Sequence, residues 1–438
     1  MNLVEFIYNM STSEEFGKWS DLHIKEGLPI SYRDKNGTII RTETEKVTQQ
    51  DFDFLLKSII EDHQDFGEKE RNVENMLTIE SGDMDFALSV KPDNIEEELA
   101  PRFRCSLYFY SGRKIGLVMR KINSDILSIE KLNLPRVSRE FNQKNSGLVL
   151  VTGPTGSGKS TTLAAMIQEI NETRAENIIT VEDPIEYVYE ESKSIISQRE
   201  IGIGKDSTSF HKALRGALRQ DPDVILVGEI RDSETANMCL EAAQTGHLVF
   251  GTLHTRDAIG TITRFIQLFE NSDKGRVRHV LSDSLVGIIS QALVPRKGGG
   301  KVMIPEVVSL STLPIRNTIR EEGKSAQMNN QFFNVNYKET GNISLNQSLL
   351  EAVLDDKIEV STALEYTIDF QDMAKRLKDK GVDRSDSIED SSEESLHQKP
   401  PLEKEVKKES TTSDKPKKES GLSGGSSKLF GKSFGGKK

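Results

Sequence analysis

The stretch from residue 146 to residue 162, SGLVLVTGPTGSGKSTT, constrains this chain more than any other. Residues 148–151 form an apolar run with the length and composition of a buried strand. They lead into GPTGSGKS at 153–160, which has the G-x-x-x-x-G-K-[ST] spacing of a phosphate-binding loop. Residues 161–170 then carry apolar side chains at helical spacing. Strand, glycine-rich loop and helix in this order predict a site for a nucleoside triphosphate.

The residue types of this loop have separate chemical roles. Its glycines let the backbone curl so that successive N–H groups point at one anion, and the helix adds the positive end of its dipole. Lys159 is expected to reach the β- and γ-phosphates, and the Ser160 hydroxyl to contact Mg²⁺. The predicted nucleotide contacts of this segment are Gly153, Thr155, Gly156, Ser157, Gly158, Lys159, Ser160 and Thr161.

Carboxylates follow two further predicted strands. Glu182 and Asp183 come at the end of the strand predicted over residues 178–181. Many phosphate-loop ATPases carry an aspartate at the end of a second strand, near the metal. Here Gly228 takes that place and Glu229 follows it. Because parallel strands end at one edge of a sheet, we expect these acids to lie beside the phosphate loop, as magnesium ligands and as candidates for the general base.

Histidines and arginines near the same segments add candidates. His247 and His254 flank a predicted strand, and we expect His247 to sense the γ-phosphate, with a structural role as the alternative. Fixed cations stabilise charge on a transferred phosphoryl group, and Arg231, Arg104 and Arg120 are candidates for this role. Which arginines reach the site, and from which subunit, is left open.

Composition narrows the function classes. The net charge of −11 disfavours nucleic acid as the main partner, because phosphate backbones require concentrated positive charge. Cys105 and Cys239 are the only cysteines, which excludes a disulfide framework and a four-cysteine zinc site and indicates a reducing, cytoplasmic location. We find no signal peptide and no apolar run near the ~20 residues that span a bilayer. Any role at a membrane is therefore expected to come through a partner protein.

The chain divides by pattern into an α/β protein with a tail. A separate small α/β domain is expected first, with a hairpin turn at Asn36–Gly37. The part that follows the linker alternates strand and helix, which predicts a parallel sheet covered on both faces, and its residues 278–293 and 344–377 carry helical spacing. The end of the chain is poor in apolar residues and is predicted to be disordered. The predicted boundaries are 1–120 for the first domain, 121–145 for a polar linker, 146–375 for the ATPase domain and 376–438 for the tail.

With these pieces placed, residues 1–375 closely resemble the secretion-type ATPases, and within them the type IV pilus retraction ATPases of the PilT and PilU twitching-motility group. Four motifs occur in order: a Walker A loop at 153–160, an aspartate box at 180–186, an atypical Walker B at 224–232 and a histidine box at 246–255. The resemblance implies a PAS-like first domain, a RecA-like core and a homo-hexameric ring. It also implies that ATP hydrolysis powers pilus retraction at an inner-membrane platform protein, with the ring peripheral to that membrane.

The resemblance also implies residue roles. Glu182 and Glu229 become catalytic acids, and the choice of base between them stays open. Ser160, Glu182, Asp183 and Glu229 are the expected metal contacts, and Lys159 binds nucleotide. The arginines and His247 remain the candidates named above.

Several features bear on the branch of this family. Assembly and export ATPases typically carry paired CxxC motifs, which this chain lacks. The segment PIRNTIR at 314–320 resembles the retraction motif but departs from it at Pro314 and Thr318. Residues 114–122 and the length beyond the core resemble the PilU branch, which often assists a PilT motor. The alternative hypothesis is therefore an accessory subunit that binds ATP, joins a paralogous retraction ATPase and has little turnover of its own.

Overall fold

The computed structural model of the chain describes most of the first 382 residues. The described ranges are 2–13, 19–34, 37–62, 83–92, 101–112, 114–122, 126–202, 206–310, 312–324, 327–328, 332–333 and 341–382. The predicted tail from residue 383 onward, and Asn36 of the predicted turn, lie outside them.

The N-terminal part is built on a six-stranded antiparallel sheet with the order β3-β2-β1-β6-β5-β4. Alternate residues of its strands are apolar, and Leu22, Phe103 and Leu117 are fully buried in a core shared with the two helices α1 and α2. This period of two is what places one face of each strand in the core. The elements are α1 (Leu3–Thr12), β1 (Trp19–Lys25), β2 (Ser31–Asp34), β3 (Ile39–Arg41), α2 (Gln49–Asp62), β4 (Asp83–Ser89), β5 (Arg102–Tyr110) and β6 (Lys114–Lys121).

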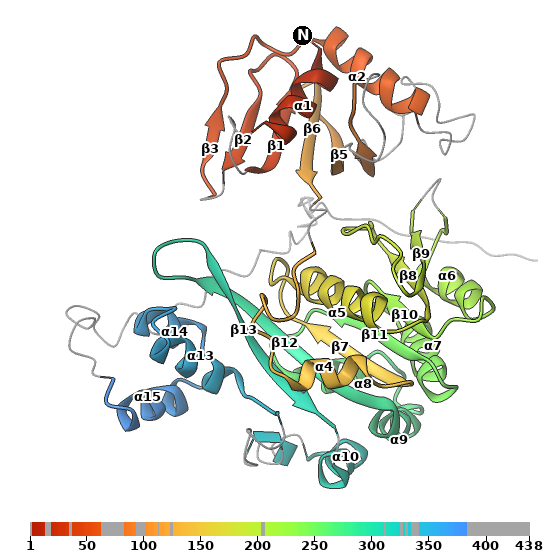
Figure 1. Cartoon of the computed structure of the whole chain (residues 1–438), viewed down its shortest axis with the longest axis vertical. Coiled ribbons are helices and arrows are strands. Elements are labelled where there is room, and N and C mark those ends of the chain that lie inside the picture. The colour runs from red at the N-terminus through yellow and green to blue at the C-terminus, as the bar shows by residue number, and fades with distance from the viewer. Residues whose placement is uncertain are drawn as a thin grey trace, which may run out of the picture. The chain divides into compact units, whose positions relative to one another are not determined.

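The second part is organised on a seven-stranded mixed sheet with the order β13-β12-β7-β11-β10-β8-β9, in which only β13 pairs antiparallel with its neighbour (Figure 1). Its strands are β7 (Gly147–Thr152), β8 (Asn177–Glu182), β9 (Ile195–Glu200), β10 (Val224–Val227), β11 (Leu248–Leu253), β12 (Leu285–Pro295) and β13 (Lys301–Ser309). Its helices are α4 (Val137–Asn142), α5 (Lys159–Thr173), α6 (Phe210–Ala217), α7 (Ser233–Gln244), α8 (Ala258–Gln267), α9 (Lys274–Ser284) and α10 (Leu313–Arg320).

Helices cover both faces of this sheet. On β7, Leu148 and Leu150 pack in a core cluster with α7, α8 and α9, whereas Val149 and Val151 pack in another with α4 and α5. A strand buried on both faces reads as a continuous apolar run, and all six residues of β7 are buried. The predicted α/β class with a RecA-like core is confirmed.

Three expectations about elements need correction. The helix expected over 278–293 ends at Ser284, and residues 285–295 form β12, a strand with neighbours on both sides. Most of its residues are apolar, and they show no alternation that would separate the strand from a buried helix. The expected linker contains α4, whose Phe141 is 1% exposed in the core. The expected start of the tail at 376 falls inside the last helix, which continues to Asp379 because Leu377 packs into a core cluster.

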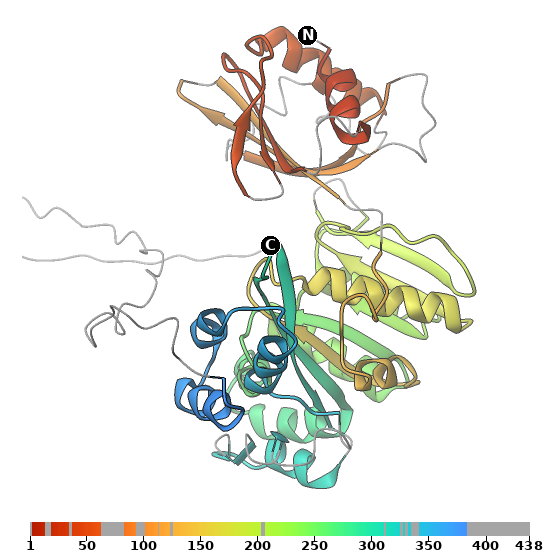
Figure 2. The same cartoon turned by 60° about the vertical axis from the view of Figure 1, so that its left-hand side comes forward.

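Three short helices close the second part: α13 (Leu345–Leu354), α14 (Val360–Tyr366) and α15 (Phe370–Asp379). Leu349 of α13, Ala363 of α14 and Met373 of α15 share a core cluster with residues of β12 and β13. Figure 2 shows the three helices grouped beside these two long strands. We call α13–α15, residues 345–379, the C-terminal helices.

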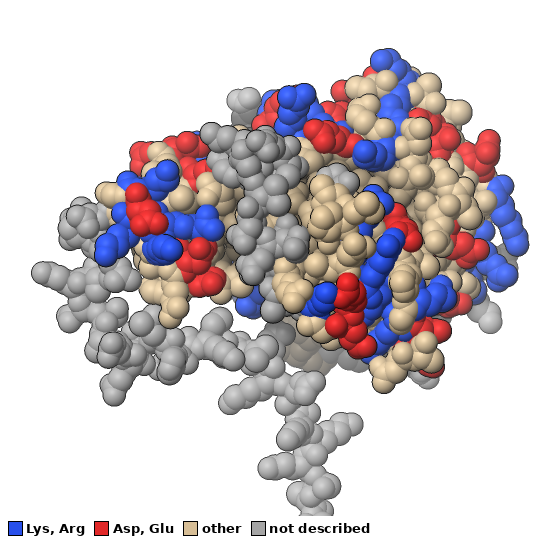
Figure 3. Space-filling model, turned by 90° about the horizontal axis from the view of Figure 1, so that it is seen from below, with Lys and Arg blue, Asp and Glu red and all other residues tan. Residues whose placement is uncertain are grey.

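The end of the second part that carries α9 and α10 has a mixed surface charge. Arg320 at the end of α10 pairs with Asp283 of α9, and Arg320 Nε also donates to Ser282 Oγ over 2.8 Å. Figure 3, which views the molecule from this side, shows basic and acidic side chains interspersed over the visible described surface.

Candidate nucleotide-binding site

The phosphate loop has a backbone that requires glycine. It runs from the end of β7 at Thr152 to the start of α5, and Gly153, Gly156 and Gly158 have φ values of 148°, 77° and 91°. These values lie in the region that side chains with a Cβ rarely adopt. A Cβ on Gly153 would also collide with the Ser157 hydroxyl. The loop is therefore curled as the sequence predicts, with the amino end of α5 directly behind it.

Lys159 lies over this curl. Its ammonium group donates to the carbonyl oxygens of Gly153 and Pro154 over 3.0 and 3.2 Å. Burial lowers the pKa of Lys159, while the charges of Glu229 and Glu186 oppose that change. The ammonium group thus stands where an anion held by the loop amides would accept from it.

Gln291 supports the loop from β12, and no sequence pattern pointed to it. Its Nε2 donates to the Ser157 carbonyl over 2.8 Å, and the residue is 3% exposed. Within the described part of the chain, Ser157 Oγ and Gln291 Oε1 are buried polar atoms with no hydrogen-bond partner. Buried polar atoms are normally paired, so these two fit a loop that is built to take a polar ligand.

Four parallel strands bring the other candidates to the same edge of the sheet. Leu253 at the end of β11 lies opposite Thr152, and Val227 at the end of β10 lies opposite Val181 of β8. The strand ends therefore line up in the order β7, β11, β10, β8, about 4.8 Å apart. His254, Glu229 and Glu182 lie at three of these ends.

Glu229 is held between the side chains of Arg231 and His254. Its Oε2 lies 2.7 Å from Arg231 Nη2, and its Oε1 lies 3.3 Å from His254 Nε2. Burial acts to raise the pKa of Glu229, but the hydrogen bond and charge of Arg231, together with His254, outweigh it and lower the pKa. Glu229 is therefore ionised at neutral pH. Arg231 lies close enough to Asp183 for that carboxylate to favour its charged form.

Glu182 lies in the opposite environment. Its Oε1 accepts from Thr180 Oγ1 over 2.7 Å and from Gln198 Nε2 over 3.3 Å. These bonds lower its pKa less than burial raises it, and the pKa of Glu182 becomes about 7. One site thus holds two glutamates, of which one is ionised and the other is close to half protonated at neutral pH.

The structure does not bring His247 to this site. β11 begins at Leu248, opposite Gly147 at the start of β7, so His247 lies at the other edge of the sheet, about 20 Å along the strand. Its Nδ1 lies 2.9 Å from the carbonyl oxygen of Ala242. The expectation that His247 senses the phosphate from within this chain is therefore corrected. His254, at the other end of the strand, occupies that place.

Two predicted arginines lie elsewhere in the chain. Arg104 and Arg120 are directly opposite each other on β5 and β6 of the N-terminal sheet, and Arg120 Nε donates to Asp21 over 2.8 Å. Arg104 is exposed. Their role as nucleotide contacts stays a prediction.

The remaining loop residues are consistent with a bound magnesium nucleotide. Thr161 Oγ1 lies 2.8 Å from the hydroxyl of Tyr187, a buried residue directly after the aspartate box that no sequence motif marked. The described residues contain no group of three or more His, Cys, Asp or Glu side chains suited to a metal ion. Proteins often hold Mg²⁺ through one or two oxygen ligands together with substrate phosphates. That Ser160, Glu182, Asp183 and Glu229 contact the metal stays a prediction. Thr155 is an exposed position on the loop.

Comparison with known proteins gives the family. The profile described as "Type II/IV secretion system protein" matches residues 38–347. The chain belongs to this family. It is 43% identical over 309 residues to the "Type IV pilus retractation ATPase PilT" of Pseudomonas aeruginosa, covering 70% of this chain and 83% of that protein. It is 32% identical to the "Type IV pilus ATPase PilU" of the same organism, with 82% and 88% covered. A "Twitching motility protein" of Neisseria gonorrhoeae is 50% identical over 52% of this chain and 60% of its own length.

Solved structures agree with this placement. The "Crystal Structure of the Pilus Retraction Motor PilT and Bound ADP" superposes with a TM-score of 0.71 at 39% identity, covering 86% of this chain and 99% of that one. The ATPase DotB of Legionella pneumophila superposes with a TM-score of 0.67 at 26% identity, covering 82% and 94%. The chain is a nucleotide-using ATPase of this family. No helix in its described ranges has the length and hydropathy needed to cross a bilayer.

Proposed function

We propose that this ATPase is the motor of type IV pilus retraction, the process that the names of its PilT relatives state. One structural observation supports ATP hydrolysis at this site. Four adjacent parallel strands end in the phosphate loop, His254, Glu229 and Glu182 at a single edge of one sheet. In open α/β sheets this edge is where ligands bind.

Glu229 is the better placed of the two candidate bases. It is ionised, and its charge acts on Lys159 to favour the protonated form of the lysine. We assign to Glu229 the orientation of the attacking water and acceptance of its proton. Arg231 and His254 fix the two carboxylate oxygens and so hold this orientation. Mg²⁺, bound through Ser160 and the nucleotide, would neutralise charge on the phosphates.

Glu182 takes a second role in the proposal. Its pKa near 7 makes it a group that changes charge in the working range of pH, at the end of β8 on the same edge of the sheet. We assign to it, with Asp183, the outer contacts of the metal's water ligands, which strengthen when Glu182 is ionised. Its ionisation then adds negative charge where a cation is to be held.

Assembly is the further part of the proposal. The family resemblance implies a homo-hexamer that acts on an inner-membrane platform protein from the cytoplasmic side. In such a ring Arg104 of one subunit would be able to act on the nucleotide of the next, and Arg120 could do so if it left Asp21. Arg104 is exposed and lies on the same face of the N-terminal sheet as Arg120, so both arginines are on one surface of that sheet.

The accessory-subunit alternative rests on α10, which carries the divergent retraction motif. Pro314 lies in the first turn, where proline is tolerated, and Thr318 is buried with its hydroxyl donating to the Ile315 carbonyl over 2.7 Å. The helix forms despite both departures and keeps its ties to α9 through Arg320. Because α10 keeps its helical structure and its contacts, we favour an active motor over an accessory subunit whose retraction motif no longer works.

The deciding experiment is ATP hydrolysis by the purified full chain and its Lys159→Ala variant, with oligomer size recorded by light scattering. We expect a hexamer whose turnover falls at least about 100-fold in the variant, because the ammonium group is lost from the phosphates. Nucleotide binding with negligible turnover in the wild type would favour the accessory subunit. Turnover unchanged by the substitution would exclude this site as the source of activity.

A further inference from the structure

Glu306 is a buried carboxylate that the site described above does not use. It lies on β13 and is 5% exposed. Its Oε1 accepts from the N–H of Ala258 over 2.7 Å, and its Oε2 accepts from the N–H of Leu345 over 3.3 Å. These are the first residues of α8 and α13. One carboxylate therefore satisfies the free amino ends of two helices, each of which favours a negative charge.

The first of these helices is tied to the nucleotide site. The loop from His254 to Asp257, which we call the histidine loop, joins β11 to α8. Thr261 in the first turn of α8 lies 2.6 Å from the hydroxyl of Thr255 in that loop. It also lies 3.1 Å from the hydroxyl of Thr152, the residue before the phosphate loop. Any displacement of the histidine loop thus acts on the amino end of α8.

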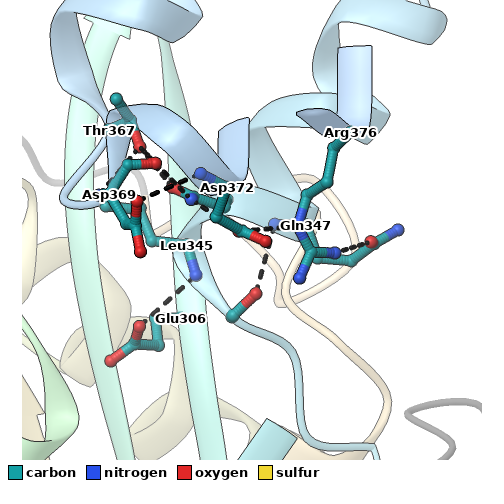
Figure 4. A network of polar contacts seen from close by, with 9 residues as sticks. Glu306, Leu345, Gln347, Thr367, Asp369, Asp372 and Arg376 are labelled. Atoms are coloured by element: carbon teal, nitrogen blue, oxygen red, sulfur yellow. Dashed lines mark hydrogen bonds and ion pairs between the residues drawn. The ribbon is translucent and has the colours of Figure 1, made fainter. Parts of the chain in front are cut away.

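The second helix opens the C-terminal helices, and its first turn is strongly held. Asn346 Nδ2 donates to Asp372 over 2.8 Å and to the Asp369 carbonyl over 3.0 Å. Arg376 donates to Asp372 over 2.7 Å and to Gln347 over 2.9 Å. Figure 4 shows this network, with Glu306 beside the amide of Leu345 at its edge. Movement of the amide of Leu345 is therefore shared by α15 as well as α13.

We propose that Glu306 is a positioning residue that couples the histidine loop to the C-terminal helices, so that nucleotide bound at the phosphate loop changes the order of α13. The proposal rests on the proposed function, because it needs a nucleotide at that loop. Its physical basis is that two helix ends share one buried acceptor group, so neither can shift without weakening its bond or moving the carboxylate.

The test is hydrogen exchange of the full chain with and without a non-hydrolysable ATP analogue and Mg²⁺. In the wild type we expect the analogue to slow exchange in residues 254–261 and also in 345–348. In Glu306→Gln, whichever way the amide turns, one helix end faces an N–H donor in place of an acceptor. We expect slowed exchange at 254–261 to persist, the response at 345–348 to be lost, and the dissociation constant of the analogue to change less than about threefold.

A second variant separates coupling from folding. Leu345→Pro removes the N–H that donates to Glu306 at the first position of α13, where proline is well tolerated. Ser344 before it is already extended, as a residue before proline must be. We expect the same loss of response at 345–348. The matched controls are Glu365→Gln, an exposed glutamate of α14, and Val360→Pro at the first position of that helix; both should respond as the wild type does.

The outcomes separate this proposal from the function. A purely structural role for Glu306 predicts a lower melting temperature with the response at 345–348 intact, which would overturn the coupling. A wild type that binds the analogue without any change at 345–348 would overturn it as well and leave the ATPase assignment standing. A wild type that does not bind the analogue would overturn both.

Discussion

At the scale of single residues, the nucleotide site depends on two glutamates whose surroundings differ. Glu229 is ionised because Arg231 and His254 contact its two oxygens, and Glu182 is close to half protonated at pH 7 because burial outweighs its two neutral donors. Pairs of carboxyl groups with separated pKa values commonly divide the roles of one active site. Each glutamate therefore predicts a different dependence on pH.

The rate of ATP hydrolysis should depend on pH in a way that follows the protonation of Glu182. If the ionised form is required, kcat decreases as the pH falls through about 7, because the carboxyl group becomes protonated. The Glu182→Gln variant should show a low, flat profile over pH 6–8, at the level of the acid form of the wild type. Steady-state rates at saturating ATP measure this. A variant that keeps the wild-type rising limb would assign that limb to another group.

Gln291 gives a prediction about binding. Gln291→Leu removes the donor to the Ser157 carbonyl and leaves that oxygen buried without a partner, which costs about 1–3 kcal/mol. Because the loop binds nucleotide, we expect the dissociation constant for ADP to rise roughly 10-fold, with kcat at saturation changed far less. Calorimetric titration measures the constant. Gln267→Leu, at an exposed position of α8, is the control, and equal effects in both variants would refute the support assigned to Gln291.

At the scale of elements, α4 is joined to the sheet through a glycine. The ring of Phe141 lies where a Cβ on Gly287 of β12 would stand, so any larger residue must displace it. Polar residues around α4 indicated a linker in the sequence, but its apolar side chains Val137 and Phe141 are buried. The segment before the phosphate loop is therefore packed as part of the ATPase core.

This contact predicts a loss of stability. Gly287→Val should lower the free energy of unfolding by about 2–4 kcal/mol, since overpacking a buried contact forces the ring and the helix to move. Gly275→Ala is the matched control: it lies in α9 with no neighbour near the added methyl group, and alanine should leave stability equal or slightly higher. Thermal unfolding of both variants gives the comparison. Equal melting temperatures would show that α4 is not packed as described.

The elements that sequence could predict are those with strong local signals. Short apolar runs that lead into motif residues mark four strands, β7, β8, β10 and β11. Because the motif residues follow these strands, the sequence predicted which edge of the sheet forms the candidate site. β13 lacks such a signal, because Pro305 and Glu306 interrupt its apolar residues; proline is tolerated there because β13 is an edge strand. The support from Gln291 was not predictable either, since its partner Ser157 is 134 positions away and no local pattern marks the pair.

At the scale of the whole molecule, two buried carboxyl groups make stability depend on pH in an unusual direction. Burial raises the pKa of both Glu182 and Glu306 from 4.5 to about 7. Between these values the folded chain binds more protons than the unfolded chain, so stability falls as the pH rises through this window and levels off above it. Each of the two carboxyl groups accounts for a loss of up to about 3 kcal/mol in the free energy of unfolding across this window, at about 1.4 kcal/mol per pKa unit.

Urea unfolding of the wild type at pH 5, 6, 7 and 8 should therefore show a midpoint that decreases up to pH 7. The doubly substituted chain Glu182→Gln and Glu306→Gln has neutral groups at both positions, so this decrease should be largely absent, whatever its overall stability. Parallel curves for the two proteins would mean that neither carboxyl group has the raised pKa.

The contacts of Lys159 bear on how the whole protein meets its substrate. Its ammonium group already has two oxygen acceptors in Gly153 and Pro154, so a nucleotide exchanges one set of lysine–oxygen bonds for another. The measured affinity is then a difference between two similar interactions, and the charge of the lysine adds less to it than a free ammonium group would. When the γ-phosphate departs, the same carbonyl oxygens are available to take the lysine back. We therefore expect Lys159 to keep oxygen acceptors throughout a cycle of nucleotide binding and release.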